Sequence, residues 1–81
     1  MSIVTVRLFA SYADLVGSST IDVPIRQGDT VSDLLDNIRS LPAASTLPAI
    51  ARVAVNRTFA SDTTRLHLED EIALIPPVAG G

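Results

Sequence analysis

The chain contains no cysteine and only one histidine, His67. The absence of cysteine excludes disulfide bonds, thiolate zinc sites and a cysteine nucleophile. A single imidazole cannot supply the several histidines of a typical zinc site. We therefore expect no metal site in this protein.

Positive charge is also scarce. All six basic residues are arginines that stand singly along the sequence, and the net charge is −3 at pH 7. Without a basic cluster, nucleic-acid binding is not expected. No apolar run reaches the roughly 18 residues that span a bilayer, and the first residues lack the basic segment of a signal peptide. Eighty-one residues have room for one domain, which we expect to be cytoplasmic and not bound to a membrane.

The first quarter of the sequence predicts two strands with a short helix between them. Residues 3–9 alternate between apolar and mixed positions and are rich in β-branched residues, as in a strand. Residues 10–16 can form a short helical turn that Gly17 closes. Residues 19–25 alternate again, and because Pro24 cannot donate a hydrogen bond, this second strand is expected at a sheet edge.

An amphipathic helix follows the turn at residues 27–29. Thr30 and Asp33 have the spacing of a capping box at its start. Apolar side chains recur at helical spacing, and Pro42 is expected to stop the helix. This apolar stripe, which must cover a sheet face, contains Val31, Leu34, Leu35 and Ile38, with Leu41 extending it.

The second half predicts short strands and one buried strand. Residues 52–55 form a strand, Asn56-Arg57 a turn, Phe59 the start of a returning strand, and residues 66–68 another short extended segment. Residues 72–75 are apolar throughout, so this strand is expected in the centre beside the first strand, with both faces covered.

This element order predicts an α+β fold of the β-grasp (ubiquitin-like) architecture, a mixed sheet with one main helix packed on one face. The domain is expected over residues 1–75 and an extended tail over residues 76–81.

The tail, rather than the body, carries the candidate chemistry. The aspartates are spread over turns and one helix face, and His67 alternates with two leucines and is expected to point to solvent. Pro76 and Pro77 keep the backbone extended as it leaves the sheet. Ala79, Gly80 and Gly81 carry almost no side chain, so they can thread a narrow channel. The pattern predicts a tail that presents a carboxyl group inside another protein's active site.

The last twelve residues, DEIALIPPVAGG, resemble the C-terminal signature of the small subunit of molybdopterin synthase, the MoaD family of sulfur carriers. The stretches VTVRLFASYADLVG, GDTVSDLL and RVAVNR resemble that family's first strand and short helix, its loop-to-helix segment and its third strand. Two turn positions differ. Family members often have glycine where this chain has Glu69, and often have glycine after the asparagine that matches Asn56, where this chain has Arg57. Glycine at such positions suggests a positive φ.

The resemblance implies a sulfur-transfer reaction in two stages. A MoeB-like adenylyltransferase, similar to ubiquitin-activating enzymes, uses ATP to convert the Gly81 carboxylate into an acyl-adenylate. A sulfur donor protein then replaces AMP, which leaves a thiocarboxylate on Gly81. The tail, residues 76–81 (Pro76, Pro77, Val78, Ala79, Gly80 and Gly81), next inserts into a MoaE-like large subunit within a heterotetramer. There it gives sulfur to cyclic pyranopterin monophosphate, and two transfers form the molybdopterin dithiolene. The chain would be an enzyme subunit without a bound cofactor, and the large subunit would supply the catalytic side chains.

A partner that receives the tail must also contact the domain beside it. The apolar candidates are Phe59, Leu68 and Ile75, together with Val78, which is expected to insert into the partner; Phe9 is expected in the core. The acidic run Glu69, Asp70 and Glu71 is a candidate to meet a basic rim of the partner.

Three other functions stay open. One is a sulfur carrier for thiamine or another biosynthesis, whose tail is expected to lack the Pro-Pro-Val run. Another is a ubiquitin-like modifier that is conjugated to lysines. The third is an interaction module whose terminus has no chemical role.

Overall fold

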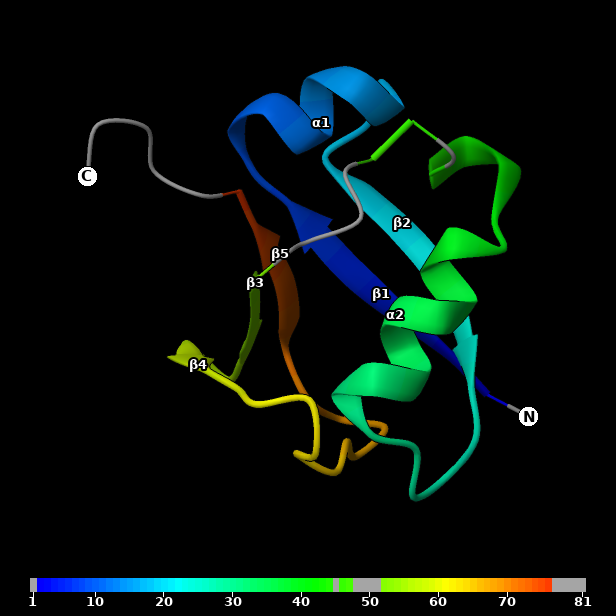
Figure 1. The fold of residues 1–81 in the computed structure, drawn as a ribbon, viewed down its shortest axis with the longest axis vertical. Coiled ribbons are helices and arrows are strands. Elements are labelled where there is room, and N and C mark those ends of the chain that lie inside the picture. The colour runs from blue at the N-terminus through cyan, green and yellow to red at the C-terminus, as the bar shows by residue number, and fades with distance from the viewer. Residues whose placement is uncertain (1, 45, 48–51, 77–81) are drawn as a thin grey trace.

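The computed structural model describes residues 2–44, 46–47 and 52–76, which form one mixed sheet with two α-helices and a short 3₁₀ helix (Figure 1). The five strands lie in the order β2-β1-β5-β3-β4, with β1 and β5 parallel and the other pairs antiparallel. The elements are β1 (Ser2–Leu8), α1 (Ala10–Val16), β2 (Thr20–Ile25), α2 (Val31–Arg39), η1 (Pro42–Ala44), β3 (Arg52–Val55), β4 (Thr58–Phe59) and β5 (Ile72–Ile75). The predicted β-grasp fold, with its last strand in the centre beside the first, is confirmed.

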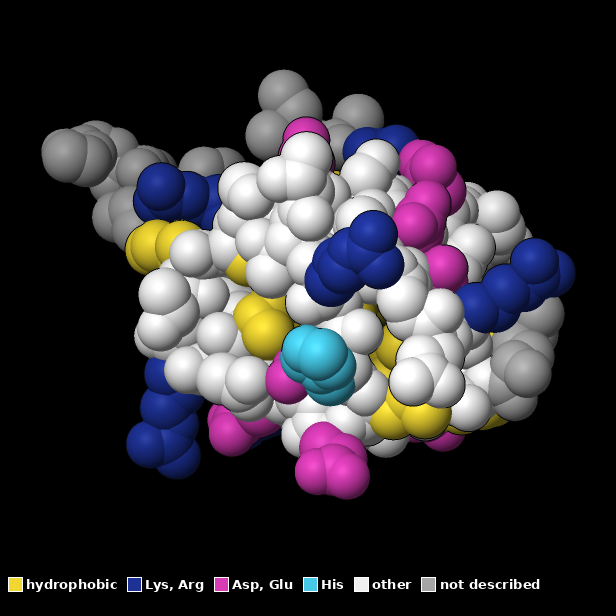
Figure 2. Space-filling view, turned by 90° about the horizontal axis from the view of Figure 1, so that it is seen from below, with side chains coloured by type: hydrophobic (Ala, Val, Ile, Leu, Met, Phe, Trp, Pro, Cys, Tyr) yellow, Lys and Arg dark blue, Asp and Glu magenta, His cyan; other side chains and the backbone are white. Residues whose placement is uncertain are grey.

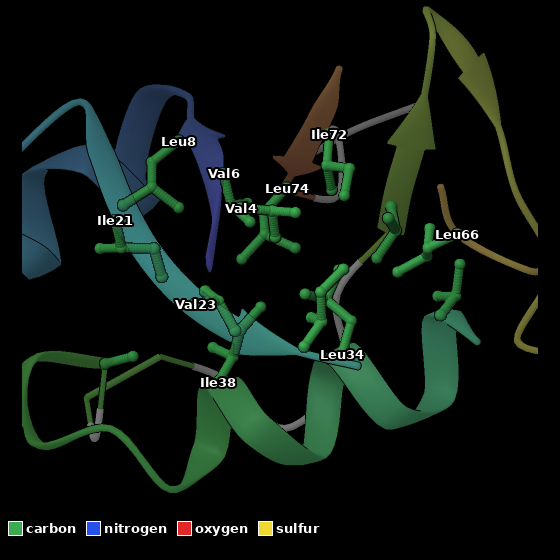
Figure 3. Packing of buried hydrophobic residues seen from close by; sticks show 14 of the residues in the cluster. Val4, Val6, Leu8, Ile21, Val23, Leu34, Ile38, Leu66, Ile72 and Leu74 are labelled. Carbon is green, nitrogen blue, oxygen red and sulfur yellow. The ribbon is translucent and has the colours of Figure 1, made fainter. Parts of the chain in front are cut away.

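One face of the sheet is covered by α2, and the core lies between them (Figure 3). The side chains of Val6 and Val23 from the sheet and Leu34 from the helix are fully buried there. The predicted capping box is present, since the Asp33 amide donates to Thr30 Oγ1 at 3.3 Å and the Thr30 amide donates to Asp33 Oδ2 at 2.9 Å. The helix ends at Arg39, three residues before Pro42, so Leu41 packs against the core from the following loop.

Residues 66–68, predicted as a short extended segment, belong to no strand of the sheet, and Leu68 lies in a turn. The loop before these residues supplies carbonyl groups to the first turn of α2, since the Val31 amide donates to the Thr64 carbonyl and the Ser32 amide to the Asp62 carbonyl. The Leu66 amide donates in turn to the Asp29 carbonyl. The backbone amide of Leu66 is therefore bonded to the turn before the helix rather than to the sheet. Leu66 is buried, whereas Leu68 lies in a turn and is 44% exposed.

The edge position of β2 is confirmed, and its outer edge is blocked at Pro24. Proline offers no donor there, and the Asn37 side chain of α2 donates to the Pro24 carbonyl at 2.7 Å. Neither backbone group of Pro24 is left to pair with another strand. The free edge of β2 is therefore a poor site for adding a strand.

Three non-glycine residues in the described part of the chain have a positive φ: Ala10 at 49°, Asn56 at 53° and Arg57 at 69°. Asn56 and Arg57 form the tight turn between β3 and β4, and two successive positive φ values are typical of a type I′ hairpin turn. Glu69 has no positive φ. The turn at Glu69 therefore differs from one that needs glycine, while Arg57 adopts the conformation that glycine favours.

Candidate functional site

The sheet face opposite α2 carries a row of side chains that runs across four strands. Arg7 on β1 pairs with Ala73 on β5, Ala73 pairs with Ala54 on β3, and Ala54 pairs with Phe59 on β4. Residues that are paired across strands project from the same face of a sheet. One step nearer the end of β5, Ile75 pairs with Arg52. This outer face therefore has small alanines in its centre and large side chains on both sides.

The alanines leave a hollow of about 360 Å³ in the outer face, which we call the outer hollow. Alanine side chains end at Cβ, so the face is lowest at Ala54 and Ala73. The lining consists of Arg7, Phe9, Ala54, Arg57, Phe59, Glu71, Ala73 and Ile75. Because Ile75 in this lining is the last residue of β5, the hollow lies directly beside the point where the chain leaves the sheet.

Two sequence predictions about this face were wrong. The apolar strand β5 is fully covered on one face only, where Ile72 and Leu74 are buried; Ala73 and Ile75 on the outer face stay partly exposed. Phe9, expected in the core, is 39% exposed and lines the hollow. It follows β1 as the N-cap residue of α1, where the chain turns away from the sheet. The domain therefore leaves an apolar surface uncovered at the end of β5.

Arginines surround the outer hollow, but only one of them is neutralised. The Arg7 guanidinium lies 3.3 Å from the Glu71 carboxylate and 5.3 Å from the centre of the Phe9 ring. Arg52 stacks on Phe59, with 4.4 Å between the guanidinium carbon and the ring centre. Within the described part of the chain, Arg52 and Arg57 form no ion pair. The rim is therefore neutral on the β1 side and cationic along the β3–β4 hairpin.

The acidic run at residues 69–71 does not form one free patch. The Asp70 carboxylate accepts hydrogen bonds from the His67 amide at 2.8 Å and from the Asn56 side chain at 2.9 Å. The first of these hydrogen bonds is the main reason that the pKa of Asp70 is lowered. Asn56 also accepts from the Glu71 amide at 2.9 Å, so it ties the β3–β4 turn to the start of β5. Of the three acidic residues, Glu69 alone has no side-chain partner in the described residues.

The single histidine, His67, lies at the loop end of the molecule (Figure 2). His67 is exposed there, as predicted, and its side chain lies on the surface in Figure 2. The described residues contain no group of three His, Cys, Asp or Glu side chains that could hold a metal ion. None of the helices in this part of the chain is long and apolar enough to cross a membrane.

The structure brings together only some of the predicted interface residues. Phe59, Ile75 and Glu71 line the outer hollow, whereas Leu68, Glu69 and Asp70 are not part of its lining. Pro76 directly follows β5, and the predicted tail residues 77–81 lie outside the described residues. The role of each of these residues in binding a partner stays a prediction.

Sequence reasoning missed the arginines and the two central alanines of the hollow. The alternation of β1 already placed Arg7 opposite the buried Val4, Val6 and Leu8. What the sequence lacked was the register, which decides that Ala73 and Ala54 lie next to each other. Without the register, a run of apolar residues in β5 looked like a strand buried on both faces.

The ThiS family matches residues 6–81 of this chain. Two relatives carry the name molybdopterin synthase sulfur carrier subunit. The relative from Arabidopsis thaliana is 28% identical over 79 residues, which cover 96% of this chain and 82% of the relative. The relative from Dictyostelium discoideum is 31% identical over 81 residues, which cover 94% of this chain and 93% of the relative.

Solved structures with the same fold include a small archaeal modifier and a subunit of a two-subunit complex. SAMP1 from Haloferax volcanii has a TM-score of 0.78 and 31% identity, and the match covers 99% of this chain and all of that chain. A chain in the complex of subunits 1 and 2 of the molybdopterin-converting factor from Helicobacter pylori has a TM-score of 0.68 and 21% identity, with coverage of 99% and 100%. At that identity the second match shows the fold alone.

Proposed function

Because the chain belongs to the ThiS family, we propose that it is the sulfur carrier subunit of a molybdopterin synthase and that Gly81 holds the sulfur. The observation that supports this most is the similarity to two molybdopterin synthase sulfur carrier subunits over more than nine-tenths of the chain. The family match also includes the whole predicted tail, residues 76–81. We further propose that the protein works in the cytoplasm, where ATP is present for its activation.

The proposed chemistry begins at the Gly81 carboxyl group. A carboxylate does not exchange oxygen for sulfur directly, because oxide is a poor leaving group. An ATP-dependent adenylyltransferase joins the carboxylate to the α-phosphate of ATP and releases pyrophosphate. Sulfide-level sulfur (HS⁻) supplied by a donor protein then attacks the acyl carbon, AMP leaves with the bonding electron pair, and a thiocarboxylate remains. In molybdopterin synthase this sulfur passes to cyclic pyranopterin monophosphate, and two transfers complete the dithiolene.

The outer hollow gives the tail a fixed starting point in this proposal. Ile75 lines the hollow and is also the last residue of β5, directly before Pro76. A partner that binds in the hollow therefore also fixes the direction in which the tail leaves. The six residues from Pro76 to Gly81 can reach on the order of 20 Å when extended. The proposed partner is the synthase large subunit, in a heterotetramer, and the Helicobacter pylori chain of the same fold was solved in a complex of subunits 1 and 2.

A second candidate function is protein modification, in which Gly81 is joined to lysine side chains. The observation that favours it is the 31% identity to SAMP1, a protein named as a small archaeal modifier. Both functions begin with the same activation of Gly81. Blotting for conjugates of high molecular weight separates them, because a carrier that serves only the synthase forms none.

The test of the proposed function is an intact-mass measurement after incubation with ATP, the adenylyltransferase and a sulfide source. We expect the mass difference of one sulfur for one oxygen, located on the C-terminal peptide. Modification at an internal residue instead would contradict a carrier role for Gly81.

The matched variant for this experiment is Gly81→Val. A β-branched side chain next to the carboxyl group crowds its reaction with ATP and widens the last residue of the tail. A misplacement of about 1 Å can lower a rate on the order of 100-fold. Molybdopterin formation in a purified two-subunit assay should therefore be lost, while the melting temperature should stay unchanged. Near-normal product formation by this variant would show that Gly81 is not the reacting residue.

A further inference from the structure

We propose that the large-subunit surface that binds the outer hollow is acidic, with an apolar side chain on the alanine floor and carboxylates against Arg52 and Arg57. This inference rests on the proposed function and adds the chemistry of the partner surface. It also reverses the expectation from the sequence, in which the acidic run at residues 69–71 was to meet a basic partner.

The distribution of charge around the hollow supports an acidic partner. On the β1 side, Glu71 already occupies Arg7 at 3.3 Å, so this side offers little net charge. On the hairpin side, Arg52 and Arg57 have no carboxylate within the described part of the chain. One positive charge, that of Arg57, therefore remains in the lining of the hollow, and a second, that of Arg52, lies beside it on the Phe59 ring. A partner with carboxylates on the matching side would complement this wall, and a basic partner would be repelled by it.

The stacking of Arg52 on Phe59 makes this wall well suited to binding. A guanidinium that lies on a ring at 4.4 Å is held in place by the contact and keeps its N–H groups at the ring edge free for an acceptor. Phe59 itself is 57% exposed, so its other surface is open to an apolar side chain. Arginine and aromatic residues of this kind are enriched among the residues that dominate protein–protein affinity.

A protein surface fits the hollow better than a nucleic acid. The floor is made of Ala54 and Ala73 with Ile75 at its end, and it offers no side-chain hydrogen bond to a base or phosphate. Arg7 in the lining is already paired with Glu71 at 3.3 Å, so it is not free to bind a phosphate. The charge of the whole chain is −3, which also disfavours a polyanion. A protein surface can place an apolar side chain on this floor and a few carboxylates against Arg52 and Arg57, which a nucleic acid with a phosphate at every nucleotide cannot do.

Two of the three residues of the acidic run already hold contacts within the chain. Asp70 uses its carboxylate to hold the loop through His67 and Asn56, and Glu71 uses its carboxylate on Arg7. Glu69 is outside the lining of the hollow. The charges that stay available beside the hollow are therefore the two arginines of the hairpin.

The experiment is a calorimetric titration of the purified large subunit with the wild type and with Arg52→Glu, Arg57→Glu and Arg26→Glu. Arg26 is the control because it is an exposed arginine directly after β2 that neither lines the hollow nor stacks on a residue of its lining, and it forms no ion pair in the described residues. At low salt we expect Arg52→Glu and Arg57→Glu each to weaken binding roughly tenfold or more, and Arg26→Glu to weaken it less than about threefold. Raising the salt from about 50 to about 500 mM should weaken wild-type binding and reduce these differences.

Several results would overturn the inference. One is wild-type affinity that does not change with salt, and another is binding by both hairpin variants that equals that of Arg26→Glu. A third is binding of a single-stranded RNA oligonucleotide that Arg52→Glu abolishes, because it would assign the face to nucleic acid.

Thermal melts check that each variant is folded. If Arg52→Glu does not fold, Arg52→Gln is used in its place, with a smaller expected loss. If the wild type binds but the charges have no effect, only this inference fails; if the wild type does not bind at all, the proposed function fails as well.

Discussion

At the scale of single residues, Arg57 in the β3–β4 turn has two opposite effects. Its backbone conformation is unfavourable for the fold, whereas its charge favours binding at the surface. Arg57 has a φ of 69°, a conformation that costs a residue with a Cβ atom on the order of 1 kcal/mol. Its side chain lines the outer hollow as one of the two unpaired cations of the hairpin. The residue with the strained backbone is therefore also a residue that places a positive charge at the candidate docking surface.

Replacing Arg57 by glycine removes both the strain and the charge, so stability and binding should change in opposite directions. Glycine adopts a positive φ without strain, and this outweighs its larger entropy in the unfolded chain. We expect Arg57→Gly to stabilise the fold by roughly 0.5–1 kcal/mol, measured by urea unfolding, and to weaken binding of the large subunit. Arg57→Asn is the control, because asparagine also tolerates a positive φ and removes the same charge. A variant that is less stable than the wild type would show that the Arg57 side chain makes contacts that outweigh the strain.

At the scale of elements, helix α2 followed from the sequence in type, start and buried face. Its capping box and apolar spacing are both local patterns, so they are visible without knowledge of the fold. The pattern did not show which of the apolar residues of α2 lie deepest in the core. Leu34 is fully buried, whereas Leu35 packs at the edge of the core and is only partly buried. The angle at which a helix meets the sheet decides between such neighbours, and that angle depends on the tertiary packing.

The two leucines predict different costs for the same substitution. Leu34→Ala should lower the free energy of unfolding by about 2–5 kcal/mol, because it leaves a cavity in the core. Leu35→Ala should cost less, about 1 kcal/mol, because Leu35 is only partly buried at the edge of the core. Chemical denaturation of both variants measures the difference. Equal losses would mean that α2 is rotated from the orientation described here.

The strands were harder to interpret than the helix, and the reason is physical. The sequence of an apolar strand such as β5 looks the same whether its second face is covered by its own chain or by another protein. Likewise, the position of Phe9 in the core or outside depends on the direction in which the chain leaves β1. The sequence therefore located the strands and the tail, while the partner-facing surface required the register of β1, β5, β3 and β4.

At the scale of the whole molecule, the outer face of the sheet is divided into two unlike halves. On the half formed by β2 and β1, Thr5 donates to Asp22 at 2.9 Å, and the exposed Ile3 lies opposite Pro24. On the half formed by β5, β3 and β4, the centre is alanine and the walls are phenylalanine and arginine. The apolar half is the one that the end of β5 adjoins. The division places the candidate docking surface beside the tail and leaves the remainder of the sheet face to solvent.

Two exposed apolar residues, Phe59 and Leu68, were both predicted as interface residues, and alanine variants can now tell them apart. Phe59 is 57% exposed and Leu68 is 44% exposed, so neither substitution should lower the melting temperature much. Phe59 lines the outer hollow and carries the Arg52 stack, whereas Leu68 is outside the lining. We expect Phe59→Ala to weaken binding of the large subunit roughly tenfold or more, and Leu68→Ala to change it less than about twofold. Titration calorimetry beside thermal melts measures both. If Leu68→Ala weakened binding as much as Phe59→Ala, the partner would have to extend over the loop at residues 66–70, and the outer hollow would be only part of its contact surface.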